Sequence, residues 1–208
     1  MNAAWHHAAR IRQPLNVLVS LRPLDIDTMD PVTRCKLFTS FRNKLGGYAR
    51  SHHFAPTLIW SREANLDGAG EHLHVLMHVP RRHQEHFEDT LVGWYPGPAE
   101  MDIRTAHQRT TITENGKRYS AVGYISKQMT PQAWYKRGLE RKKGGPIFGK
   151  RGGSTANLNW RARAAFRSTW NTPPRSVPVT TSTTVNIDAS RKPICSPPRD
   201  RTVEPRPR

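Results

Sequence analysis

The sequence predicts an α+β fold: a mostly antiparallel sheet with helices on one face, ferredoxin-like in outline. Three observations support this prediction. Apolar or alternating runs of strand length recur between residues 15 and 106, and segments with apolar side chains at helical spacing separate them. Their order is strand, helix, strand, strand, helix, strand, helix. No internal repeat runs through the chain, so one layered domain with extensions is expected.

The first strand and the long helix after it are both marked by local signals. Residues 15–21, LNVLVSL, are apolar enough for a buried strand. Asp30 can cap the helix that follows, and Pro31 suits its first turn. Apolar residues then recur at helical spacing until the glycines at 46–47, where we expect the helix to end.

The remaining elements follow from alternation and from turn residues. A second strand at 56–63 and a third at 72–79 are joined by ANLDGAG, which is typical of a hairpin turn. Beyond them we expect a helix at 81–95, a strand at 100–106 and a helix at 117–129. A proline lies shortly after each of these two helices, which supports their ends.

The composition favours a polyanionic partner and argues against a membrane protein. The net charge is +17, so nucleic acid is the first candidate partner and an anionic membrane surface the second. No apolar run approaches the ~18 residues of a membrane span, and the first residues lack the pattern of a signal peptide. Cys35 and Cys195 are far apart and offer neither a disulfide framework nor a cysteine zinc site, which favours a reducing cytoplasm.

Four parts are expected along the chain. Residues 1–12 form an N-terminal arm, and residues 13–135 form the α+β domain. Residues 136–170 form a basic C-terminal extension with interleaved aromatic side chains. The last part, 171–208, holds eight prolines and ten serines or threonines with few large apolar groups, so we expect it to be disordered.

The basic extension has the composition of a nucleic-acid-binding segment. Between residues 136 and 167 there are ten basic residues and one acidic residue, a net charge of +9. Such a segment is expected to contact the phosphate backbone without reading sequence, while its aromatic side chains stack on bases. The expected DNA-binding residues are Lys136, Arg137, Arg141, Lys142, Lys143, Lys150 and Arg151. A solvated basic segment without nucleic-acid contact is the alternative.

Histidines on the third strand are the first candidates for chemistry. In a strand, His72, His74 and His78 share one face, and apolar residues between them form the other. Glu63 ends the neighbouring strand of the expected hairpin, so it can lie beside His72 and His74. Two histidines and one carboxylate suit a catalytic divalent ion that acts as a Lewis acid. The alternative is a half-buried strand with a polar outer face, and His78 is either a fourth ligand or a polar wall.

Tyr124 and Lys127, in GYISKQ, are a second pair of residues that could take part in a reaction. Positions i and i+3 are neighbours on a helix, so the lysine ammonium can lie near the phenol or near an anion that the phenol attacks. Tyrosine can act as a covalent nucleophile, but it requires help because its free pKa is ~10. In isolation, a tyrosine beside a lysine is also an ordinary feature of a helix surface.

Together, and in this order, the two motifs resemble the HUH endonuclease superfamily over roughly residues 13–130. The family's His-hydrophobic-His motif corresponds to His72-Leu73-His74, and its tyrosine motif corresponds to Tyr124-Ile125-Ser126-Lys127. The tyrosine follows the histidines, as in rolling-circle replication initiators and single-tyrosine transposases. The stretch SREANLDGAGEHLHVLMHVP is similar to the viral-type initiator pattern, in which Glu63 matches the third metal ligand. The first strand lacks the Thr and Asn character of the family, and His78 stands where viral initiators often have Gln.

This resemblance implies a ferredoxin-like HUH fold and metal-dependent nicking and joining of single-stranded DNA. It implies that Mg²⁺ or Mn²⁺, held by His72, His74 and Glu63, polarises the scissile phosphate. Tyr124 then attacks and leaves a free 3′-hydroxyl and a 5′-phosphotyrosine link, while Lys127 offsets nearby negative charge. Such an enzyme would initiate rolling-circle replication of a plasmid, phage or virus-like element. A helicase domain is absent from this sequence, so unwinding would require a host helicase.

Several alternatives stay open at the level of sequence. A transposase that acts on the hairpin ends of a mobile element fits the same motifs. A non-catalytic basic nucleic-acid-binding protein fits the charge, and a small jelly-roll metal enzyme fits the His-x-His pattern less well because helices separate the strands. GGPIFGKR at 144–151 looks like a phosphate-binding loop, but Arg151 replaces the metal-binding Ser or Thr and Pro146 removes an amide, so no ATP site is expected.

Overall fold

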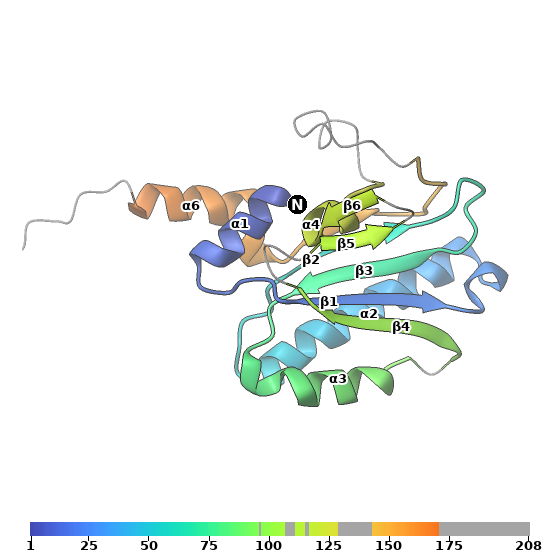
Figure 1. The fold of residues 1–208 in the computed structure, drawn as a ribbon, viewed down its shortest axis with the longest axis horizontal. Helices are drawn as coiled ribbons and strands as arrows, with labels where there is room; N and C mark the ends of the chain where they lie inside the picture. The colour runs from blue at the N-terminus through green and yellow to red at the C-terminus, as the bar shows by residue number, and fades with distance from the viewer. Residues whose placement is uncertain (96, 107–110, 115–116, 129–142, 171–208) are drawn as a thin grey trace, which may run out of the picture. The chain divides into compact units, whose positions relative to one another are not determined.

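A five-stranded antiparallel sheet is the centre of the fold in this computed structural model, which describes residues 1–95, 97–106, 111–114, 117–128 and 143–170 (Figure 1). The strand order is β4-β1-β3-β2-β7. These strands are β1 (Val17–Pro23), β2 (Leu58–Glu63), β3 (His72–Met77), β4 (Ala99–Thr105) and β7 (Gly152–Ser154). A separate antiparallel hairpin consists of β5 (Thr111–Glu114) and β6 (Lys117–Ser120). The α+β class with a mostly antiparallel sheet is therefore confirmed.

Helices of very different length surround the sheet. The α-helices are α1 (Asn2–Arg10), α2 (Pro31–Ser51), α3 (Gln84–Val92), α4 (Ala121–Ile125) and α6 (Trp160–Trp170). Short 3-10 helices are η1 (Ile26–Thr28), η2 (Arg81–His83) and η3 (Ala156–Leu158). Within the described part of the chain, none of these helices combines the length and apolar character needed to cross a membrane. All of them belong to one compact unit, Met1–Thr172.

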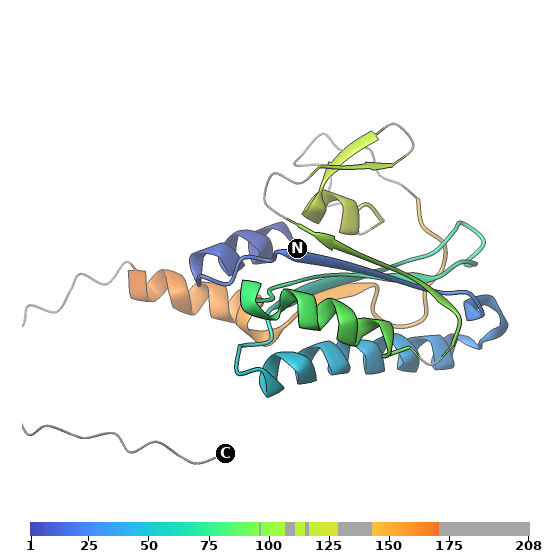
Figure 2. The same ribbon diagram turned by 60° about the horizontal axis from the view of Figure 1, so that its bottom comes forward.

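The main core lies on one face of the sheet, because alternate residues of each strand point to that face. The strands contribute Val17, Val19, Leu21, Leu58, Trp60, Leu73, Val75 and Met77. Helices α2 and α3 close this core with Phe38, Phe41, Leu45, Phe87 and Leu91. Figure 2 shows both helices on the same side of the sheet. Each large apolar side chain buried here contributes about 1.5–3 kcal/mol relative to exposure, so this face dominates the stability.

The opposite face of the sheet is divided into an apolar part and a polar part. Leu18, Ile59 and Leu76 form the apolar part, and α1 and α4 pack on it. Two residues further along the paired strands β1 and β3 the same face becomes polar, with Ser20 opposite His74. The apolar part therefore anchors α4 directly beside the polar part, where the candidate site lies.

The segment expected as one helix over 117–129 is in fact a strand followed by a short helix. Residues Lys117–Ser120 pair with Thr111–Glu114 as β6, and only Ala121–Ile125 are α-helical. The Ser120 side chain accepts a hydrogen bond from the backbone N–H of Gly123 at 3.2 Å, which is an N-terminal cap. The sequence does carry Asn-Gly at 115–116 between the two strands, a strong hairpin signal that the helical interpretation overlooked.

Helix α2 begins as expected but continues past the two glycines. The Asp30 carboxylate accepts hydrogen bonds from the backbone N–H groups of Val32 and Thr33, at 2.9 and 3.0 Å. The helix then passes through 46–47 and ends at Ser51. Glycine costs about 1 kcal/mol relative to alanine within a helix. Burial of Tyr48 and Ala49 beyond the glycines offsets this cost and extends the helix.

Two segments outside the expected α+β domain also form regular structure. The N-terminal arm contains α1, whose Trp5 and Ala8 are buried in the second core. The described part of the basic extension, 143–170, contributes β7 at the sheet edge next to β2, followed by α6. The tail at 171–208 lies outside the described residues.

Replacing Gly47 with alanine is expected to raise the free energy of unfolding by about 0.5–1 kcal/mol. A Cβ at Gly47 would meet no heavy atom within 4 Å, so the gain in helix propensity is not offset by a clash. Urea denaturation of the two proteins measures the difference. A less stable alanine variant would contradict a helix that runs through this position.

Candidate metal and tyrosine site

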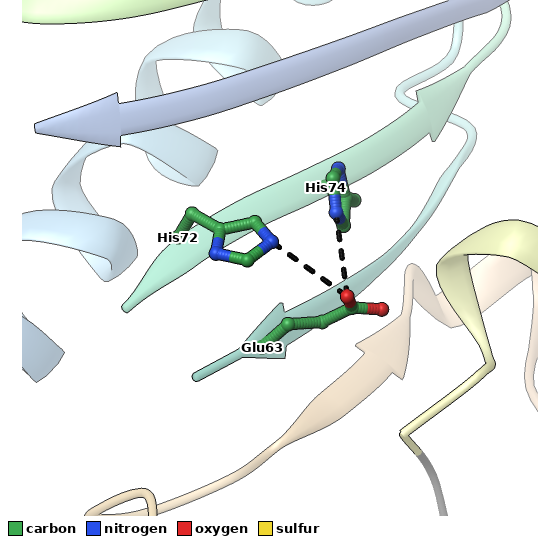
Figure 3. A group of neighbouring side chains, drawn as sticks. All are labelled: Glu63, His72 and His74. Atoms are coloured by element: carbon green, nitrogen blue, oxygen red, sulfur yellow. Dashed lines mark ion pairs between the residues drawn. The ribbon is translucent and has the colours of Figure 1, made fainter. Parts of the chain in front are cut away.

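Glu63, His72 and His74 meet on the polar part of the sheet (Figure 3). The hairpin register pairs Glu63 with His72, and His74 follows on the same face of β3. Glu63 Oε2 lies 3.6 Å from His72 Nε2 and 3.7 Å from His74 Nε2. One ligand atom from each of the three residues lies within 4.8 Å of the others. The sequence-based grouping of these residues is therefore matched by the structure.

Hydrogen bonds orient both histidine rings. His72 Nδ1 lies 2.9 Å from the backbone carbonyl of Gly70, which can only accept, so Nδ1 carries the proton. The lone pair of a neutral His72 is then on Nε2, which points at Glu63. His74 Nδ1 lies 2.8 Å from Ser20 Oγ, which can accept a hydrogen bond from Nδ1–H. Such outer contacts are the usual means of presenting histidine Nε2 to a metal ion.

The spacing of these donor atoms is better suited to binding a cation than to hydrogen bonds among the three side chains. Distances of 3.6 and 3.7 Å are too long for hydrogen bonds between the rings and the carboxylate. Both Glu63 oxygens and His74 Nε2 are buried without a hydrogen-bond partner among the described residues, although Glu63 Oε2 also forms an ion pair with Lys127 at 3.2 Å. Two ligands at ~2.1 Å from one ion lie roughly 3.0–3.4 Å apart, slightly less than the 3.6 and 3.7 Å between Glu63 and the two histidines. The group can therefore bind a metal ion.

Burial and charge set the protonation of the group. Burial alone would raise the pKa of Glu63, but contacts with His72 and His74 and the positive charge of Lys127 together hold it well below its ordinary value. Burial also lowers the pKa of His74, against the opposing effect of Glu63. An ionised carboxylate beside a neutral imidazole is the state in which both groups can be metal ligands.

Tyr124 and Lys127 reach the same place from α4 and the turn after it. The Tyr124 ring packs against the His74 ring with centroids 4.9 Å apart. Lys127 Nζ lies 3.8 Å from the centre of the Tyr124 ring and 3.2 Å from Glu63 Oε2. Val122 and Ile125 are buried against the sheet, which fixes the face that α4 presents to β3. The expected i, i+3 proximity of tyrosine and lysine holds, although α4 ends at Ile125.

His78 is not brought to this group. It follows the end of β3, where its Nδ1 lies 2.9 Å from the backbone carbonyl of Pro14. Its ring packs near Phe54, with centroids 6.3 Å apart. Four residues along a strand span roughly 13 Å, so His78 is too distant from His74 to share an ion with it.

The expected DNA-binding residues fall into three groups. Lys136, Arg137, Arg141 and Lys142 lie outside the described residues. Lys143 and Lys150 are exposed and available to a polyanion. Arg151 is only half-buried, but its guanidinium donates hydrogen bonds to the carbonyl of Gly145 and, at 3.2 Å, to Gln128 Oε1. In this position Arg151 has a structural role.

The glycine-rich stretch at 144–151 packs closely against the hairpin turn. A Cβ on Gly145 would lie 1.7 Å from the backbone oxygen of Asn65, so only glycine fits there. The buried Arg62 forms an ion pair with Glu71 and donates a hydrogen bond to the carbonyl of Phe148 at 2.7 Å. The close approach of the backbone around Gly145 to the hairpin turn explains why glycine is needed there.

Three residues that the sequence did not single out support the site. Ser20 orients His74. It is a polar residue within the largely apolar run LNVLVSL, so the sequence did carry a signal for it. Gln128 Oε1 accepts a hydrogen bond at 3.1 Å from the backbone N–H of Ala64, the residue after Glu63. Arg104 Nε pairs with Asp102 at 2.6 Å, and the pKa of Arg104 is raised first by Asp102 and also by Tyr124. Gln128 depends on a long-range contact and had no local signal, whereas the ion pair of Arg104 is with Asp102, two residues away on the same strand.

Comparisons with known proteins give no relative. No protein-family model, curated protein or solved structure matches this chain significantly.

Replacing His72 or His74 with alanine is expected to weaken Mn²⁺ binding more than about 100-fold, since outer partners of a metal site alone contribute roughly 10- to 100-fold. His78→Ala is the matched control from the same strand region, and its affinity should equal that of wild type. Isothermal titration calorimetry measures all three. Equal losses in all three variants, or no loss in any, would contradict the assignment of these ligands.

Glu63 is expected to make the stability of the metal-free protein depend on acidity. Its folded-state pKa is below the ordinary value of 4.5, so its stabilisation is complete above that pH and is lost as the pH falls towards the folded-state pKa. Between about pH 5 and about pH 3, wild type should lose about 2 kcal/mol more stability than Glu63→Gln. Urea unfolding at each pH, with chelator present, tests this. Parallel pH profiles for the two proteins would contradict it.

Proposed function

We propose that this protein is an HUH-type endonuclease and strand transferase, which nicks and rejoins single-stranded DNA through a covalent bond to Tyr124. The observation that carries the proposal is the position of Lys127. Its ammonium contacts both the Tyr124 ring, at 3.8 Å, and Glu63 of the metal-ligand group, at 3.2 Å. A nucleophile, a cation and a set of metal ligands from distant parts of the chain are thus adjacent.

Glu63, His72 and His74 would hold Mg²⁺ or Mn²⁺, the ions implied by the resemblance to this superfamily. Bound there, such an ion supplies a Lewis acid for a non-bridging oxygen of the scissile phosphate. Glu63 Oε1 and His74 Nε2 are buried without a hydrogen-bond partner among the described residues, and Glu63 Oε2 is paired with Lys127, so these atoms support this role because a metal ion could bind them. Ser20 and the carbonyl of Gly70 would keep the histidine rings oriented.

The proposed reaction is a transesterification. The Tyr124 hydroxyl oxygen attacks the phosphorus of a DNA phosphodiester, and the bond from phosphorus to the 3′-oxygen breaks. The phenolic proton is lost from Tyr124, and the departing 3′-oxygen gains a proton, so atoms and charge balance. The products are a 5′-phosphotyrosine and a free 3′-hydroxyl. Attack of a 3′-hydroxyl on the phosphotyrosine reverses the step and joins strands.

Charge around the site suits a phosphate substrate. Lys127 places a buried ammonium beside the phenol, where it would stabilise negative charge that develops on the tyrosine oxygen or the phosphate. Arg22 and Arg104 lie on the neighbouring strands of the same face with side chains 54 and 57 % exposed, and each is paired with a carboxylate, Glu100 at 3.4 Å and Asp102 at 2.6 Å. The net charge of +17 would attract DNA over long distances.

The biological role that fits this chemistry best is initiation of rolling-circle replication of a plasmid, phage or virus-like element, with a host helicase as partner. A single-tyrosine transposase would use the same residues on the hairpin ends of a mobile element. The two roles differ in the DNA that they recognise, so cleavage assays on origin-like and hairpin-end oligonucleotides separate them.

Tyr124→Phe should abolish a covalent adduct between the protein and single-stranded DNA. The phenylalanine ring retains the packing on His74 and Lys127 but lacks the nucleophilic oxygen. The assay incubates each protein with labelled oligonucleotides and Mn²⁺, denatures the mixture and measures label on the protein by gel electrophoresis. Tyr119→Phe, a change of the same kind in β6, is the matched control and should retain the adduct.

Two further outcomes decide between the proposals. Wild-type protein that binds the oligonucleotides but forms no adduct and no nick with any of them would support the non-catalytic nucleic-acid-binding alternative. An adduct that persists in Tyr124→Phe, or that maps to Tyr119, would reject Tyr124 as the nucleophile.

A further inference from the structure

A cavity of about 470 Å³ lies between α2, β2, the end of β7 and the segment that follows it. Its polar lining comes from Arg42, Asn43 and Arg50 of α2 and from Ser154, Thr155 and Asn157 beyond the sheet edge. Leu58 and Trp60 of β2 form part of its wall. These two residues face the main core, whereas Glu63 faces the opposite side of the sheet. The cavity is therefore distinct from the metal and tyrosine site.

Gly46 lines this cavity next to Arg50 without ending helix α2. Helix α2 continues through Gly46, so this glycine does not end the helix and lowers its propensity by about 1 kcal/mol relative to alanine. A Cβ at Gly46 would lie 3.4 Å from Nη1 and 3.8 Å from Nη2 of Arg50. The guanidinium of Arg50 thus lies over the bare backbone of Gly46, at the cavity that both residues line.

No described residue neutralises the positive charge at this cavity. None of the described residues that line it is acidic, and no ion pair to Arg42 or Arg50 is found in the described part of the chain. Arg42 is half-buried, its guanidinium lies 3.8 Å from the centre of the Trp60 ring, and it donates to the Phe38 carbonyl and to Thr39 Oγ1. Burial, and then the charge of Arg62, lower the pKa of Arg42. A partly desolvated cation without a counter-ion is unfavourable, and a bound anion would relieve it.

Size and lining indicate which anion fits. Two guanidinium groups without a competing carboxylate are suited to a phosphate, which accepts paired hydrogen bonds from arginine. The cavity is much larger than a phosphate ion and lies within the roughly 300–1,000 Å³ typical of small-ligand sites. Ala55, Pro56 and Leu58 offer apolar surface to a sugar or base, and Ser154 and Thr155 offer hydroxyl groups.

We propose that the cavity between α2 and β7 binds one nucleotide unit, with its phosphate on the exposed guanidinium of Arg50 beside Gly46, while Arg42 adds positive charge to the same cavity. The unit is either a free mononucleotide or one residue of a DNA strand, which share the phosphate ester that the arginines recognise. This inference does not require the nicking activity, because the cavity shares no residue with the metal and tyrosine site. A failure of one proposal leaves the other intact.

The test measures binding of inorganic phosphate, thymidine 5′-monophosphate and a short oligothymidylate by isothermal titration calorimetry. Arg50→Gln should weaken binding of the nucleotide ligands about tenfold or more, as expected for loss of a hydrogen bond to a charged group. Lys36→Gln is the matched control, because Lys36 is an exposed cation on the same helix outside the cavity. Its effect reports the loss of one positive charge alone.

A second pair of variants tests the shape of the cavity. Gly46→Leu should remove binding, since the side chain would fill space next to the Arg50 guanidinium. Gly47→Leu introduces the same residue one position further along, where a Cβ has no neighbour within 4 Å, and should bind as wild type does. Circular dichroism and urea unfolding establish that each variant is folded.

The outcomes are distinct. Weakened binding in Arg50→Gln and Gly46→Leu, with both controls unchanged, supports the site, and the ligand that responds identifies a free nucleotide or a strand as its source. Wild-type protein that binds neither nucleotide ligand would overturn the proposal. Equal effects of Arg50→Gln and Lys36→Gln would also overturn it, since they would indicate general attraction to a basic surface.

Discussion

Lys127 and Glu63 form an ion pair of 3.2 Å between side chains that are each only 1 % exposed. Removing either charge from water costs several kcal/mol, and their gross attraction is about 5 kcal/mol at an effective dielectric constant of about 20. Because both charges are buried, the combined desolvation cost equals or exceeds this attraction, so the pair adds no net stability. Its importance lies in the fact that neither charge is tolerable without the other. The turn after α4 must therefore return to the end of β2, and this requirement places Tyr124 on His74.

Two-residue alternation in HLHVLM is sufficient to predict a strand with His72 and His74 on one face, and the end of the preceding strand suggests Glu63 as a partner. The pairing of Glu63 with His72 depends on the register of the hairpin, which the sequence leaves open. The short helix around Tyr124 was predicted too long, because an apolar spacing compatible with a helix also fits a strand over four residues. Its cap at Ser120 settles the boundary.

Other supports of the site could not be predicted, because they depend on contacts between segments far apart in sequence. Gln128 bonds to the backbone N–H of Ala64, and Arg151 bonds to Gln128 while its own carbonyl accepts from the N–H of Arg62. A basic composition suggested that Arg151 contacts DNA, which stays a prediction, and the structure shows that its guanidinium also bonds to Gly145 and Gln128 beside β2. Charge pattern identifies a class of partner, whereas the role of one cation depends on which acceptors the fold places beside it.

Strand β7 has a consequence for how the chain can be divided. Its three residues pair with Ile59, Trp60 and Ser61 and cover the outer side of β2. A fragment that ended before β7 would leave the backbone N–H and C=O groups of an apolar strand open to pairing with other chains. Although β7 is short, it protects the edge of β2 from pairing with another chain. The basic extension therefore contributes to the sheet as well as to the positive charge of the protein.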